Sequence, residues 1–72
     1  MKIHPKLGSR FARAIYDERI RRGWTQKQMA DFLGMAPSLI HYYEGEDRTP
    51  RLETVDMIAA KLGMRSGIEM LK

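Results

Sequence analysis

The sequence of 72 residues has no cysteine, and it contains only three prolines, six glycines and one tryptophan. The absence of cysteine excludes a disulfide framework and a zinc site with cysteine ligands. The barrels and doubly wound sheets that carry most metabolic chemistry need roughly 200 residues or more, so this length excludes them. We therefore predict one small domain over residues 1–72.

Long hydrophobic runs are also missing. No stretch approaches the roughly 18 apolar residues of a membrane-spanning helix, and residues 1–6 lack the apolar segment of a secretory signal. Hydrophobic residues make up 43% of the chain and charged residues 31%, which is typical of a folded domain rather than a disordered chain. We expect a soluble protein of the cytoplasm.

Groups that perform catalysis or bind metals are scarce. The only histidines are His4 and His41, and neither a nucleophile–base pair nor a metal-ligand spacing accompanies them. Met29 and Met57 occur at helical spacing and are interpreted as core residues. The sequence predicts no enzyme, no cofactor and no metal site.

Positive charge is concentrated in the first third of the chain. The net charge of +4 divides into +6 for residues 1–27 and −2 for residues 28–72. An anionic partner is therefore expected to meet the first third. A solvated helix face with a chance excess of arginine accounts for the same counts, so charge alone leaves both interpretations open.

Glycine and proline divide the chain into segments of helical periodicity, and no stretch alternates like a half-buried strand. We predict an all-α domain of four to five helices. They are expected over about residues 9–22, 25–33, 37–44 and 52–62, with a short last helix from residue 66. Ser9 is expected to cap the first helix, and Gly23 to end it. Two capping boxes are predicted, Thr25 with Gln28 and Ser66 with Glu69.

Apolar residues at helical spacing predict the core. The predicted inward set is Phe11, Ala14, Ile15, Met29, Ala30, Phe32, Leu33, Ile40, Tyr43, Leu52, Val55, Ile58, Ala59 and Leu62. Trp24 is predicted to pack in the core or at its edge.

The short segment Gly34-Met35-Ala36 joins the second and third predicted helices. A turn of this length with a glycine is typical of a helix-turn-helix, whose second helix can enter the DNA major groove. Many small helical domains contain such a pair as structure only, so the turn by itself is weak evidence for DNA binding.

The residues around this turn resemble the lambda-repressor-like helix-turn-helix family, the Cro and phage-repressor type. The resemblance covers about residues 9–64 and rests on the run 19–35, with Gly-Trp-Thr-Gln at 23–26 and a turn glycine at Gly34. It continues through Glu44, Pro50 and the segments around Leu52-Glu53-Thr54-Val55 and Leu62-Gly63. It implies an all-α domain that binds operator DNA, usually as a dimer on a palindrome.

The resemblance also implies roles for individual residues. Arg19 and Glu44 match an ion pair that orients the third helix. Base contacts are expected from Pro37, Ser38, Leu39, His41 and Tyr42. Phosphate contacts are expected from Gln26, Lys27, Arg10, Arg13, Arg48, Thr49 and Arg51. Gln26 as a plain helix former, and Arg10 and Arg13 as a solvated face, stay open as alternatives.

The expected base-reading residues depart from the common pattern, because none is Arg, Lys, Asn or Gln. Leu39 and Tyr42 are expected to touch thymine methyl groups, and His41 to donate to a guanine acceptor. Base discrimination is therefore expected to be modest, or to depend on DNA shape and the N-terminal segment. Ala36 gives the third helix a weak cap, and Gly45 stands one residue before the family's loop glycine.

Two further expectations concern partners. Ile68, Met70 and Leu71 predict a homodimer surface near the C-terminus, and the alternative is that they close the core of one chain. The rival function is a protein-interaction module, such as an anti-repressor or an antitoxin-like partner. The weak set of base-reading residues and the acidic second part of the chain favour this rival.

Overall fold

The structure is a computed structural model, and it describes residues 7–48 and 50–71. Within this part of the chain every regular element is helical, which confirms the predicted all-α class. The five helices are α1 (Leu7–Arg22), α2 (Gln26–Leu33), α3 (Pro37–Glu44), α4 (Leu52–Lys61) and α5 (Gly67–Met70). Thr49, an expected phosphate contact, lies outside the described residues.

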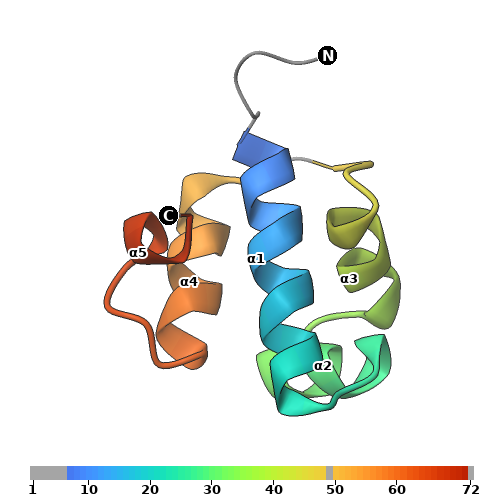
Figure 1. Cartoon of the computed structure of the whole chain (residues 1–72). Helices are drawn as coiled ribbons and strands as arrows, with labels where there is room; N and C mark the ends of the chain where they lie inside the picture. The colour runs from blue at the N-terminus through green and yellow to red at the C-terminus, as the bar shows by residue number, and fades with distance from the viewer. Residues whose placement is uncertain (1–6, 49, 72) are drawn as a thin grey trace.

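Helix α1 runs through the middle of the molecule, with α3 on one side and α4 and α5 on the other (Figure 1). Helix α2 lies at the C-terminal end of α1, and α5 lies beside α4. None of the helices that the structure describes is long and apolar enough to span a membrane.

The helix ends follow the local signals in most places. Gly23 and Gly34 have φ values of +72°, a conformation that glycine adopts without the cost a Cβ atom imposes. The capping box of α2 is confirmed. Thr25 N–H donates to Gln28 Oε1 at 2.8 Å, and Gln28 N–H donates to Thr25 Oγ1 at 3.1 Å.

One predicted cap is wrong, and another is present only in part. Helix α1 begins at Leu7, so Ser9 lies inside helical backbone, whereas an N-cap residue needs an extended one. At α5, Ser66 Oγ accepts from Glu69 N–H at 3.3 Å, but the Glu69 carboxylate accepts from the N–H of Arg65, not from that of Ser66. Only half of the second capping box is therefore present.

The core gathers residues from all five helices. Its buried members are Phe11, Ile15, Met29, Ala30, Leu33, Ile40, Tyr43, Val55, Ile58, Ala59, Leu62 and Met70. Ala14 and Trp24 pack against it and are partly buried. Three predicted core residues are exposed instead, namely Phe32 (45%), Leu52 (64%) and Met57 (37%). Leu52 is the first residue of its helix, and Phe32 packs against Trp24 at 5.0 Å between ring centroids.

The packing of α5 on α4 determines which of the C-terminal apolar residues are buried. Gly67 N–H donates to Asp56 Oδ1 at 2.9 Å, and a Cβ atom on Gly67 would come within 2.9 Å of Val55 Cγ1. This close approach buries Met70 and half-buries Leu71 in the core, while Ile68 is 74% exposed. A dimer surface made by all three residues is therefore wrong, because two of them close the core of one chain.

Candidate nucleic-acid interface

The turn between α2 and α3 is held from both sides. Met35 N–H donates to the carbonyl of Ala30 at 2.9 Å, while Gly34 takes the left-handed conformation. From α4, the Lys61 ammonium donates to the carbonyl of Leu33 at 2.9 Å. These bonds satisfy two of the last carbonyls of α2 and tie the turn to the rest of the domain.

Helix α3 turns one face to the core and one to solvent. Ile40 and Tyr43 point inward as predicted, and Phe11 meets the Tyr43 ring edge-on at 5.1 Å. The exposed face carries Pro37, Ser38, His41 and Tyr42. Leu39 also packs in part against the core. Four of the five expected base-reading residues thus share one open surface, and the fifth is half-buried.

The Glu44 carboxylate joins α3 to two other parts of the fold. Arg19 donates from Nε to Glu44 Oε2 at 2.7 Å and from Nη2 to Oε1 at 2.9 Å, and its Nη1 donates to the carbonyl of Trp24 at 2.9 Å. The side chains are 13% and 8% exposed. The hydrogen bonds to Glu44 raise the pKa of Arg19 above its ordinary value, although burial opposes this. The pair fixes the orientation of α3 against α1.

Gln26 belongs to the same network, which the sequence does not reveal. Its Nε2 donates to Glu44 Oε1 at 3.1 Å. Gln26 is the first residue of α2, where the backbone N–H groups of the first turn attract anions. The network therefore sets the N-terminus of α2 and the C-terminus of α3 in one fixed relation.

Much of the positive charge in the first third is paired inside the fold. Arg13 and Asp17 lie 3.1 Å apart, and Lys27 and Asp31 lie 3.0 Å apart, in exposed pairs one helical turn apart. Such pairs are weak, so Arg13 and Lys27 can exchange their carboxylates for phosphates at small cost.

Glu18 is a buried acid that sequence reasoning missed. Arg21 and Arg22 both donate to it, Arg22 from Nε at 2.7 Å, and Arg22 also donates to the carbonyl of Leu62 at 3.0 Å. Burial alone raises the pKa of Glu18, but the hydrogen bonds and charges of the two arginines outweigh it and hold this pKa below its ordinary value. The spacings i+3 and i+4 are the signal that would have found this cluster.

The remaining expected phosphate contacts lie in different places. The Arg48 guanidinium lies over the Tyr42 ring, 5.6 Å from its centroid, beside the exposed face of α3. Arg51 is exposed at the N-cap position of α4. Arg10 instead donates to the carbonyl of Leu71 at 3.4 Å, so it lies on the side of α1 that faces the C-terminus. The structure therefore brings Arg48 to α3 and places Arg10 away from it.

In the loop after α3, the left-handed turn residue is Glu46 and not the preceding glycine, Gly45. Gly45 has an ordinary φ of −83°, and Glu46 takes the left-handed conformation with φ of +62°. The left-handed residue thus stands at the position of the family's loop glycine.

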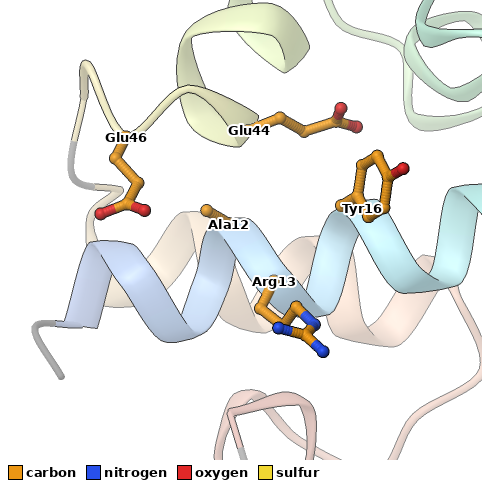
Figure 2. Close-up of a pocket in the computed structure, with 5 residues that line it drawn as sticks. All are labelled: Ala12, Arg13, Tyr16, Glu44 and Glu46. Carbon is orange, nitrogen blue, oxygen red and sulfur yellow. The ribbon is translucent and has the colours of Figure 1, made fainter.

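A shallow hollow of about 350 Å³ lies between α1 and the end of α3. Its lining residues are Ala12, Arg13, Tyr16, Glu44 and Glu46. In Figure 2 the Tyr16 ring lies near the Glu44 carboxylate, whereas Arg13 points away from it. The Glu44 carboxylate at this hollow is already bonded to Arg19 and Gln26. Among the described residues no group of three or more His, Asp or Glu is placed to hold a metal ion.

Comparisons with known proteins agree with this geometry. A sequence model described as helix-turn-helix matches residues 15–67, a range that contains α2, α3 and α4. The crystal structure of a hypothetical transcription factor, NHTF from Neisseria, is similar with a TM-score of 0.81 at 22% sequence identity. The similarity covers 93% of this chain and 76% of that one. Because only 22% of the residues are identical, it shows the fold alone. Among curated proteins no sequence matches.

Proposed function

The chain belongs to the lambda-repressor-like helix-turn-helix family of DNA-binding regulators, and on this premise we propose that it acts as a sequence-specific dimeric repressor on a palindromic operator. The observation that carries the proposal is the open face of α3, held in a fixed orientation by the Arg19–Glu44 pair. A helix held in this way can enter the major groove without further ordering.

The proposed complex divides the contacts by chemistry. Ser38, His41 and Tyr42 on α3 meet base edges. The N-terminus of α2 with Lys27, together with Arg48 and Arg51, meets phosphates and sets the register. The similar Neisseria protein is described as a hypothetical transcription factor, which supports the regulatory part of the proposal. A cytoplasmic location and a prokaryotic or phage origin follow from the family resemblance and stay predictions.

A salt series with mixed double-stranded DNA fragments tests DNA binding. We expect the logarithm of the binding constant to fall linearly with the logarithm of salt concentration, with a slope of about −0.9 for each phosphate neutralised. Arg51→Ala is expected to make the slope shallower by about one per protomer. Arg65→Ala is the matched control, because Arg65 is exposed before α5 and its carboxylate partner is Glu69.

A slope near zero for the unchanged protein would exclude the DNA-binding proposal and leave the protein-interaction module. If DNA binds, Arg51→Ala should weaken all sequences about equally. Ser38→Ala and His41→Ala should instead change which site is preferred in selection from a random pool. Equal losses on every sequence from all three variants would contradict the proposed division of contacts.

A further inference from the structure

The exposed face of α3 has an unusual chemical character for a helix that reads bases. Its four open residues form a continuous stripe, because positions 37, 38, 41 and 42 are one residue or one turn apart. Two of them, Pro37 and Tyr42, present rings, and the other two present one hydroxyl and one imidazole. The structure describes this helix completely, and it carries no guanidinium, ammonium or carboxamide group.

The edges of the bases set what such a stripe can recognise. Guanine and adenine are usually read by two parallel hydrogen bonds from Arg, Lys, Asn or Gln. Ser38 and His41 can each offer single bonds, which discriminate less. The apolar feature of the major groove is the methyl group at C5 of thymine, and cytosine gains the same group when it is methylated at C5.

We propose that α3 recognises its operator through C5-methyl groups of pyrimidines, contacted by Pro37 and Tyr42. This inference rests on the proposed function and names the feature of DNA that its reading helix selects. Leu39 has a smaller part than the sequence suggests, because its side chain packs against the core.

The Tyr42 ring is held in place for such a contact. The Arg48 guanidinium lies 5.6 Å from its centroid, and the His41 ring centroid lies 5.9 Å away. Its side chain is also anchored on a helix whose opposite face is buried through Ile40 and Tyr43. A ring positioned in this way loses little freedom when a methyl group packs against it.

Pro37 supplies the second apolar surface. It is the first residue of α3, where its fixed φ suits the helix. Pro37 and Tyr42 are five residues apart, so they lie more than one turn from each other along the helix. They therefore cannot contact the same methyl group, and we expect two selected methyl groups in each half-site.

The test begins with sites selected from a random DNA pool by the full chain. Each thymine of a selected half-site is then replaced singly by deoxyuridine, which lacks only the methyl group. We expect binding to weaken by about fourfold at each of two positions, the size of one buried methyl group. Replacing such a thymine–adenine pair by 5-methylcytosine–guanine should retain more binding than replacing it by cytosine–guanine, which separates the methyl group from the base that carries it.

A second DNA series provides the contrast. Purines are replaced singly by their 7-deaza analogues, which remove the N7 acceptor and leave every methyl group in place. We expect smaller losses here than from deoxyuridine. Losses that are larger at N7, together with no effect of deoxyuridine, would overturn the inference while the proposed function stands.

Variants assign the contact to a side chain. Tyr42→Ser should abolish the difference between thymine and deoxyuridine at one position, whatever it does to overall affinity. Arg51→Ala should weaken both DNAs and leave their ratio unchanged. Thermal unfolding of each variant shows that it is folded. If the unchanged protein selects no sequence at all, the proposed function and this inference fail together; if Tyr42→Ser leaves every ratio unchanged, the assignment to Tyr42 is wrong.

Discussion

At the scale of single residues, Glu44 is a point where separate helices are joined. Its carboxylate accepts hydrogen bonds from Arg19 on α1 and from Gln26 on α2, while its backbone ends α3. Three helices are thus joined at one nearly buried group. The same group lines the hollow next to Tyr16 (Figure 2), and the Arg19 guanidinium lies 5.3 Å from the Tyr16 ring centroid.

Removing the positive partner leaves Glu44 buried with less compensation. We expect Arg19→Met to lower the free energy of unfolding by about 3 kcal/mol, as measured by urea denaturation. The matched control is Arg13→Met, whose exposed pair with Asp17 should contribute less than about 1 kcal/mol. Similar losses from both variants would show that the pair with Glu44 has no special role.

Two contacts of the Glu44 carboxylate also show what could be predicted at this scale. The Arg19–Glu44 contact was expected because the resemblance links positions 25 residues apart. The Gln26–Glu44 bond was not, because no local pattern reports which side chains meet when α2 is folded against α3. A glycine at position 67 carried no signal either, although Asp56 and Val55 leave no room for a Cβ atom there.

At the scale of helices, α3 lacks a side-chain cap at its N-terminus. Its N-cap residue, Ala36, has extended backbone and makes no side-chain capping bond. Helix α2 has a complete capping box by comparison. The orientation of α3 consequently depends on its buried face and on Glu44 rather than on its own first turn.

This gives a stabilising prediction. Ala36→Ser supplies a hydroxyl at a position whose backbone already suits an N-cap, and we expect a gain of about 1 kcal/mol in the free energy of unfolding. The control is Thr25→Ala, which removes the hydroxyl cap of α2 and should lose about the same amount. Both are measured by denaturant titration, and no gain from Ala36→Ser would mean that the end of α3 is satisfied in another way.

The last turn of α1 is held by charge rather than by apolar packing alone. Arg22 links Glu18 to the carbonyl of Leu62 and lies over the rings of Trp24 and Phe32, at 5.1 and 5.4 Å. The cation explains why Phe32 stays partly exposed: its ring forms part of a surface for Arg22. The apolar periodicity of α2 predicts a buried Phe32, because it contains no information on the contact between Phe32 and Arg22.

The lowered pKa of Glu18 makes stability depend on pH. Because its pKa in the folded protein lies below the ordinary value of 4.5, its contribution is present above pH 4.5 and is lost as pH falls through the folded pKa. We expect the difference in unfolding free energy between the unchanged protein and Glu18→Gln to be largest near neutral pH. It should shrink between about pH 4.5 and lower pH in urea titrations, and a difference that is constant down to about pH 3 would contradict this.

At the scale of the whole molecule, the charge asymmetry is smaller than the sequence counts indicate. Five basic residues of the first third form ion pairs within the fold, and two of these pairs, Arg19 with Glu44 and Lys27 with Asp31, join the first third to acids of the second part of the chain. Two of the proposed phosphate contacts, Arg48 beside α3 and Arg51 at the start of α4, lie in the part counted as acidic. The proposed DNA contacts therefore depend on the placement of a few cations, not on the excess in the first third.

The proposed dimer has a prediction of its own at this scale. Ile68 is the most exposed large apolar side chain that the structure describes, and we expect Ile68→Asp to weaken operator binding at least tenfold while thermal stability is retained. Ala60→Asp, on the exposed side of α4, is the control and should bind normally. Sedimentation should find two chains on each selected site, with half-sites about 34 Å apart.

A single chain that binds one isolated half-site with full affinity would contradict the dimer. In that case Ile68→Asp would also bind as well as the control variant. The proposed base contacts of α3 would still stand if one chain binds DNA, because they do not involve α5.

The sequence by itself determined the helix class, most of the helix boundaries, the capping box of α2 and the turn between α2 and α3. These depend on hydrogen bonds and φ values within three or four residues, and Thr25, Gln28, Gly34 and Pro37 carry them locally. The tertiary structure decided which apolar residues are buried and which cations are paired. It exposes Leu52, closes the core with Met70 and keeps Arg10 from α3, because those outcomes depend on packing between segments that are distant in the chain.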